Sequence, residues 1–215
     1  MTQSSNYGKA TRSNDFFNFS VVTRFNSGLR LGGGVDMGRS VIDDCIPADP
    51  SLATALFFNT ERTHNAHRVY CRVITPLKGT AEVKLNGSYQ FPGQVVVAAI
   101  YQNVAAPTIE ANYPAPTALA KPTLGRDLAG GTKTVTVPLI RPNTLFEKRR
   151  TQVDLRLTKI FRVGARVRLQ ANLDAYNVMN ANSILTRNNT FGSTWGRPGR
   201  ILDARLIQFG GQLNF

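Results

Sequence analysis

Residues 165–176 read ARVRLQANLDAY, and this stretch decides the fold class because its side chains alternate in character at every position. Alanine, valine and leucine stand at the odd positions, whereas arginine, glutamine, asparagine, aspartate and tyrosine stand at the even positions. A period of two residues is typical of a β-strand that has one apolar face and one polar face. Helical periodicity is hard to find anywhere in the chain. The sequence therefore predicts an all-β protein.

The same alternation recurs along the rest of the chain. It predicts seven antiparallel strands, at about residues 15–25, 29–38, 78–91, 94–113, 148–161, 165–178 and 200–215. Strands of soluble proteins usually run for about 5–6 residues, whereas tilted membrane strands need about 9–11. Residues 94–101 are apolar on both faces, so the pattern leaves their orientation open. The lengths favour strands that cross a membrane.

The connections between the predicted strands alternate between short and long. Each short connection joins a phenylalanine to an apolar residue through three residues that include glycine: residues 25–29, 91–95 and 161–165. Three-residue hairpin loops use glycine because it tolerates a positive φ. Long surface loops are expected at about residues 41–76, 114–147 and 180–200. This alternation is typical of an up-and-down transmembrane β-barrel of the bacterial outer membrane, with short periplasmic turns and long surface loops.

The predicted barrel assigns aromatic and charged residues to different places. If the short turns are periplasmic, four phenylalanines lie at one membrane interface, where aromatic girdles are common: Phe25, Phe91, Phe161 and Phe215. The polar face then lines the lumen, and its predicted charges are Glu82, Lys84, Asp154, Arg156, Arg166, Arg168 and Asp174. We expect these charges to form cross-strand pairs that hold the wall together, rather than to bind a ligand directly.

Two features lead us to expect a larger protein. Single-chain bacterial outer-membrane barrels have even numbers of strands, and an open sheet of seven strands leaves two unpaired edges in lipid. Residues 1–6 contain neither the basic nor the apolar region of a signal peptide. The longest apolar run, residues 95–101, is far shorter than the roughly 18–20 residues of a membrane-spanning helix. We therefore expect the targeting signal and further barrel strands outside these 215 residues.

The net charge of +13 raises the question of a polyanionic partner. A soluble, basic, nucleic-acid-binding β-protein would interleave exposed aromatic residues with lysine and arginine on one face. Here the phenylalanines and tyrosines accompany valine, leucine and alanine, which argues against nucleic acid. A small outer-membrane barrel that closes by self-association, with a structural or adhesive role, is a second alternative.

Few residues suggest site chemistry. Cys45 and Cys71 stand in polar, loop-like sequence and predict one disulfide in an oxidising compartment, with two unpaired thiols as the alternative. The pair His64 and His67 lacks a third metal ligand, and a solvated loop is the simpler interpretation. The glycines at 32–34 lack the lysine and hydroxyl residues of a phosphate loop. With no catalytic constellation, we expect neither an enzyme nor a cofactor.

The C-terminal half resembles a known family. Residues 152–161 and 165–180, the latter ending DAYNVMN, are similar to the penultimate hairpin of TonB-dependent outer-membrane receptors. The closest likeness is to the Oar-like group, which carries a carboxypeptidase-regulatory-like domain at its N-terminus. The motif NNTFG at 188–192 before Trp195 and the ending QFGGQLNF fit the same pattern, as do GRS at 38–40 and YC at 70–71.

This resemblance implies a barrel of twenty-two strands, of which the chain forms about the last third. It also implies an N-terminal plug, energy supplied through the TonB complex, and import of a scarce solute such as a siderophore complex, cobalamin or an oligosaccharide. The terminal Phe215 matches the signal that the barrel-assembly machinery reads. The chain itself contains no plug and no TonB box, and no ligand-binding residue can be carried over from the family.

Overall fold

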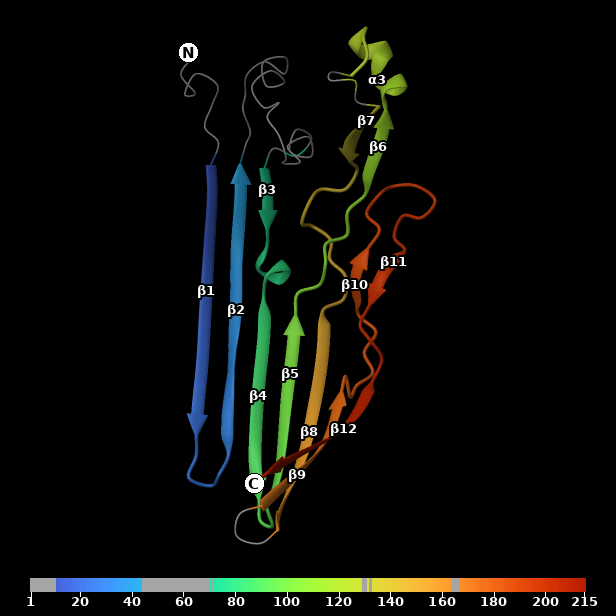
Figure 1. The fold of residues 1–215 in the computed structure, drawn as a ribbon. Helices are drawn as coiled ribbons and strands as arrows, with labels where there is room; N and C mark the ends of the chain where they lie inside the picture. Colours follow the sequence, from blue (N-terminus) through green and yellow to red (C-terminus); the bar gives the residue numbers. More distant parts are fainter. Residues whose placement is uncertain (1–10, 44–69, 71, 129–130, 132, 164–166) are drawn as a thin grey trace.

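The computed structural model describes residues 11–43, 70, 72–128, 131, 133–163 and 167–215. Most of its strands form one antiparallel meander, in which neighbours in sequence are neighbours in the sheet, as Figure 1 shows. Its seven long strands are β1 (Thr11–Arg24), β2 (Arg30–Asp43), β4 (Glu82–Phe91), β5 (Val95–Val104), β8 (Arg150–Val163), β9 (Val167–Tyr176) and β12 (Leu206–Asn214). The short strand β3 (Arg72–Thr75) extends the sheet beside the far end of β2.

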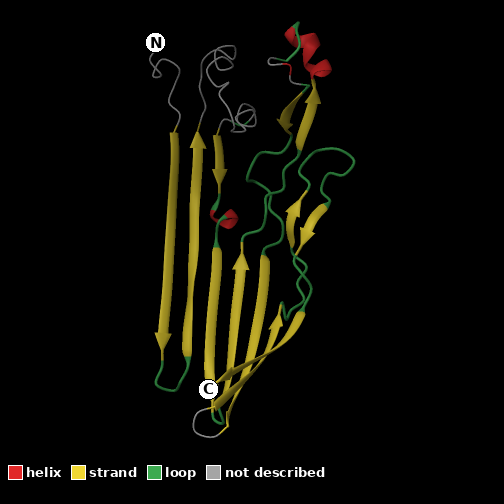
Figure 2. Ribbon diagram, viewed as in Figure 1, coloured by secondary structure: helices red, strands yellow, loops and turns green. Residues whose placement is uncertain are grey.

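The predicted antiparallel all-β architecture is confirmed, but the sheet is not a closed barrel. The strand order runs from β1 to β12, and no pairing joins these two outermost strands within the described part of the chain. Figure 2 shows the strands as a single layer, with helix confined to short segments. No helix among the described residues is long and apolar enough to cross a membrane.

The strand register carries one face of the sheet through all seven long strands without a break. Residues directly opposite one another in antiparallel strands point to the same side of the sheet. One such set, called here the cross-sheet row, comprises Thr23, Leu31, Gly87, Ala99, Leu155, Ala175 and Ile207. In every pairing of the seven strands, odd-numbered residues stand opposite odd-numbered residues. The sheet therefore has an odd face and an even face.

The first two predicted turns have the expected length and glycine conformation. In the first turn, Phe25 N–H donates to the Leu29 carbonyl at 2.9 Å, and Gly28 has a φ of 86°. In the second, Gly93 has a φ of 78°, and Gln94 also adopts a positive φ of 63°. A positive φ is uncommon for a residue other than glycine, so this glutamine was not expected in that conformation.

The third predicted turn, at residues 161–165, is wrong in position. Strand β8 continues to Val163, where Arg162 pairs with Arg168 and Val163 pairs with Val167. Valine favours extended backbone, and the pairing with β9 adds hydrogen bonds to these two residues. The connection therefore falls at residues 164–166, outside the described residues.

Three predicted strands are also too long. The strand expected at 78–91 begins at Glu82, after a 3-10 helix at Leu77–Gly79. The strand expected at 94–113 ends at Val104, and the next antiparallel pairing is an isolated bridge between Thr108 and Phe146. The strand expected at 200–215 begins at Leu206, and Ile201 belongs to a separate hairpin.

The long connections contain ordered elements that the alternation did not predict. They are β6 (Asn112–Pro116), α3 (Thr117–Leu124), β7 (Thr134–Pro138), β10 (Ile184–Arg187), β11 (Pro198–Ile201) and the 3-10 helix η2 (Leu77–Gly79). Strand β6 pairs with β7, and β10 pairs with β11, as two small sheets. Figure 1 shows these elements at the end of the main sheet opposite to the short turns, here called the loop end.

The sheet has almost no buried core. Among the described residues, the buried apolar side chains are those of Val73, Ala111, Ala115 and Pro138. They lie in β3, before β6, in β6 and in β7, and none belongs to the seven long strands. The side chains on the faces of the main sheet are therefore not covered by a second layer of secondary structure.

Candidate functional site

The odd face of the sheet carries a continuous surface of exposed apolar side chains, here called the apolar band. It consists of the odd-numbered residues of segments 17–25, 29–37, 83–91, 95–101, 153–163, 167–175 and 207–215. Apart from Thr23 and Lys159, these residues are aliphatic, aromatic or glycine. Leu85, Leu157 and Phe209 expose 49%, 43% and 80% of their surface.

Polar residues end the apolar band toward the loop end. Asp15 stands directly opposite Arg39 on the odd face, beyond the apolar residues of β1 and β2. Three strands further on, the Asn103 amide donates to the Thr151 hydroxyl at 2.8 Å, beyond the apolar residues of β5 and β8. The predicted aromatic residues lie at or next to the turn end of the band: Phe25, Phe91, Phe161 and Phe215. On β8, the exposed Val163 continues the band by one odd position beyond Phe161.

The turn-end edge of the band runs obliquely across the strands. Thr23 of the cross-sheet row lies two residues before Phe25, and Gly87 lies four residues before Phe91. On β8, the next strand that runs toward the turn end, the interval between Leu155 of the row and Phe161 is six residues. On β12 it reaches eight residues, between Ile207 and Phe215. The line of phenylalanines thus moves by about one residue per strand relative to the row.

The loop-end edge has the same slope. The last apolar residue of the band lies six residues beyond the row on β2, at Met37, and four residues beyond it on β4, at Val83. On β8 the last apolar residue, Val153, lies two residues beyond the row, and on β9 it is the row member Ala175 itself. The edges shift by one residue per strand, with about 3.3 Å per residue and 4.8 Å between strands. The strands are therefore tilted by roughly 35° from the direction perpendicular to the edges of the band.

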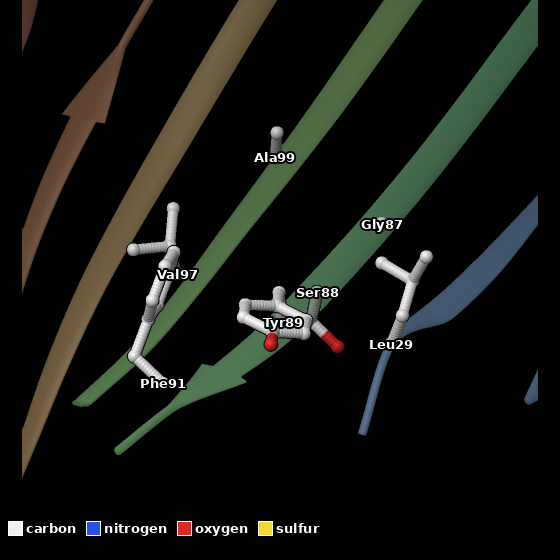
Figure 3. A pocket seen from close by; sticks show the side chains of 7 residues that line it. All are labelled: Leu29, Gly87, Ser88, Tyr89, Phe91, Val97 and Ala99. Atoms are coloured by element: carbon white, nitrogen blue, oxygen red, sulfur yellow. The ribbon is translucent and has the colours of Figure 1, made fainter. Parts of the chain in front are cut away.

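A shallow recess of about 200 Å³ interrupts the apolar band beside the second turn. Gly87 and Ala99 stand opposite each other and leave it open, because neither has a large side chain. Figure 3 shows the aromatic rings of Tyr89 and Phe91 beside it, and their centroids lie 4.6 Å apart in an edge-to-face arrangement. The recess belongs to the band and contributes almost only apolar surface.

Lys159 is the one charged residue within the band among the described residues. Its Nζ atom donates to the Gly93 carbonyl oxygen at 2.7 Å and lies 5.7 Å from the centroid of the Phe161 ring. The ammonium group therefore reaches the second turn, while the aliphatic stem lies along the apolar surface. This geometry lets a lysine occupy the band close to its edge.

The even face carries the predicted charges. Six of the seven residues share this face according to the register: Glu82, Lys84, Asp154, Arg156, Arg168 and Asp174. The seventh, Arg166, lies outside the described residues. The Arg156 guanidinium makes the expected kind of cross-strand ion pair with Asp174. The Lys84 ammonium instead pairs along its own strand with Glu82, at 2.6 Å.

Uncharged polar groups complete much of the even face. The Asp154 carboxylate accepts hydrogen bonds from the Gln152 amide at 2.9 Å and from the Asn177 N–H at 2.8 Å. The hydroxyl of Thr158 donates to the amide oxygen of Asn172, directly opposite, at 2.7 Å. This face also has apolar members on β5, among them Val96, Ala98 and Ile100.

The residues that join the loop-end elements to the sheet were not identified from the sequence. Arg149 donates to the Asn103 side chain at 2.6 Å and to the Ala81 carbonyl at 2.6 Å. Arg187 of β10 forms an ion pair with Glu147 at 2.5 Å, and both side chains are largely buried. Both arginines stand in irregular or short-strand sequence, where no periodic signal distinguishes them from other basic residues.

The predicted disulfide partners Cys45 and Cys71 lie outside the described residues, as do His64 and His67. Within the described part of the chain, no group of three or more histidine, cysteine, aspartate or glutamate side chains could hold a metal ion. Comparisons with known protein families, with curated proteins and with solved structures found no match.

Proposed function

We propose that this chain forms the C-terminal part of the β-barrel of a TonB-dependent receptor, which imports a scarce solute across the bacterial outer membrane. The oblique apolar band is the observation that carries this proposal. Both of its edges cross the strands at the same slope, as they must if a flat membrane sets the edges and the strands are tilted. The tilt of roughly 35° lies at the lower end of the range of about 35–45° found in outer-membrane barrels.

The height of the band also suits a membrane. Nine residues at a rise of about 3.3 Å, tilted by roughly 35°, span about 22 Å along the membrane normal. The apolar band of outer-membrane barrels is about 25 Å tall. Soluble monomers rarely expose apolar patches of more than a few hundred Å², so an uncovered band across seven strands favours lipid as its surroundings.

The distribution of aromatic residues favours lipid over nucleic acid. Most aromatic side chains of the long strands belong to the apolar band, whereas Phe16 and Tyr176 stand on the even face. A nucleic-acid surface requires aromatic side chains among basic ones, as platforms on which bases stack. Here most basic residues of the strands lie on the even face, whereas most aromatic residues lie on the odd face.

The outer edges of β1 and β12 call for further strands. In the described part of the chain, each of these strands pairs on one side only. Unpaired backbone groups are not tolerated in lipid, so both edges need partners. We assign these partners to additional strands of the same barrel, with a plug domain inside it and contact with the TonB complex through that domain. The barrel-assembly machinery is the proposed partner of the terminal strand β12.

Fractionation of native cells tests this proposal. An antibody against the segment around α3 should detect a band that sediments with the outer membrane, requires detergent for extraction and is several times heavier than 23.6 kDa. A band near 23.6 kDa in the same fraction would favour the self-associating small barrel instead. Detection in the soluble fraction would overturn the membrane proposal altogether.

A further inference from the structure

A second cavity lies on the even face at the loop end of the sheet. It has a volume of about 450 Å³, within the range of about 300–1,000 Å³ that is usual for small-molecule pockets. Glu82, Val104 and Arg150 line it from three adjacent strands, and Val104 stands directly opposite Arg150. Strand β10 contributes Ile184 and Leu185. The cavity therefore lies where the sheet meets the loop-end elements.

Six of the ten lining residues are aliphatic, although polar and apolar atoms contribute nearly equal surface. These six are Val104, Ala105, Ala106, Pro107, Ile184 and Leu185. Small side chains in the connection after β5 keep the cavity open, and their apolar surfaces favour a ligand with a hydrocarbon body. The polar side chains of the lining are those of Thr80, Glu82 and Arg150.

Arg150 is the charge in this lining that lacks a partner among the described residues. Its Nε atom is buried and makes no hydrogen bond. The preceding arginine, Arg149, is instead occupied by oxygen atoms of Asn103, Lys78 and Ala81. The Glu82 carboxylate is held by Lys84 at 2.6 Å. Arg150 lines the cavity, and its guanidinium has no ion pair within the described part of the chain, so an oxyanion in the cavity would supply the missing counter-charge.

We propose that this cavity binds a small amphipathic carboxylate, with its carboxylate on Arg150 and its aliphatic body against Val104, Pro107 and Ile184. The planar guanidinium can donate two parallel hydrogen bonds to a carboxylate. The identification of such a carboxylate with the imported solute rests on the proposed receptor function. The binding site itself does not.

Binding measurements on the detergent-solubilised protein from native membranes test the site. The probes are cyclohexanecarboxylate, the uncharged cyclohexanecarboxamide and inorganic phosphate, each titrated by calorimetry. We expect saturable binding of the carboxylate, with the amide and phosphate at least tenfold weaker. Equal binding of phosphate would overturn the need for an apolar body, and equal binding of the amide would overturn the role of charge.

Variants separate the site from general ionic attraction. Arg150→Gln should weaken carboxylate binding at least tenfold, and Ala106→Phe should weaken it by filling the cavity while the charge remains. Arg168→Gln removes a cation from the same face at the other end of the strands, and binding should stay within twofold of the unmodified protein. Unchanged affinity in Arg150→Gln, or an absence of carboxylate binding, would overturn the proposal. Carboxylate binding by a protein found in the soluble fraction would support the site while overturning the receptor function.

Discussion

Arg156 and Asp174 stand directly opposite each other on β8 and β9, and the guanidinium covers the carboxylate. Nε and Nη2 of Arg156 donate to the two oxygens of Asp174 at 2.5 and 3.0 Å. Asp174 is 6% exposed, although it lies on an open face of the sheet. The adjacent pair, Thr158 and Asn172, is bonded in the same direction. Side chains therefore reinforce the backbone ladder between these two strands.

Removal of the arginine should destabilise the protein because it leaves a mostly buried carboxylate unpaired. We expect Arg156→Ala to lower the free energy of unfolding by about 1–3 kcal/mol. Lys84→Ala is the matched control, because the Lys84–Glu82 pair is more exposed and should contribute only about 0–1 kcal/mol. Denaturant unfolding in detergent micelles measures both values. Equal losses of unfolding free energy in the two variants would show that the burial of Asp174 does not strengthen its ion pair with Arg156.

The two faces should differ in their tolerance of a new charge. Leu157 lies four residues before Phe161 at the middle of the apolar band, and Asn86 lies at a similar depth on the even face. An arginine at the midplane on the lipid side costs about 2–4 kcal/mol. We therefore expect Leu157→Arg to reduce the urea-resistant outer-membrane fraction strongly, and Asn86→Arg to leave it nearly unchanged. A similar loss in both variants would contradict the assignment of the faces.

The slope of the band can be measured with tryptophan as a depth probe. In a background where the native Trp195 is replaced by Phe, Phe25→Trp, Phe91→Trp and Phe161→Trp should be quenched alike by lipids brominated at one depth. Tryptophans at Thr23, Leu155 and Ile207 share the cross-sheet row but should report successively greater distances from that interface. Equal depths along the row would mean that the strands are not tilted.

Gly33 is required by close packing between β2 and β4. A Cβ atom at this position would lie 2.6 Å from Cδ2 of Leu85 and 2.7 Å from the carbonyl oxygen of Lys84. We expect Gly33→Ala to destabilise the protein by about 1–3 kcal/mol, because the backbone oxygen cannot move aside freely. Gly211→Ala is the control on the same face, since nothing lies within 4 Å of a Cβ atom there. The result would contradict this packing argument if both variants had the same melting temperature.

The pairing of Cys45 with Cys71 stays a prediction, because both cysteines lie outside the described residues. We expect peptide mapping without reductant to recover one disulfide-linked peptide pair from native outer membranes. The oxidising environment of the cell surface favours that state. Recovery of both thiols in alkylated form would sink the prediction.

The loop-end architecture shows where the sequence was insufficient. The hairpins β6–β7 and β10–β11 are short, and each has only four or five residues per strand. Over so few residues a period of two cannot be told from chance. The cavity around Arg150 was missed for a related reason, since its lining joins residues 79, 80, 82, 104–107, 150 and 184–185. No local pattern reports that these segments meet.

The composition of the two faces followed from the sequence by itself, because side-chain direction alternates with a local period of two residues. Alternation therefore separated Leu169, Leu173 and Phe209 from Arg168, Asp174 and Gln208 without any tertiary information. Only the tertiary structure decided the orientation of residues 95–101, which are apolar on both sides. The register with β4 and β8 assigns Val97 and Ala99 to the apolar band and Ile100 to the even face. Register depends on hydrogen bonds between strands that are distant in sequence, and so does the slope of the band.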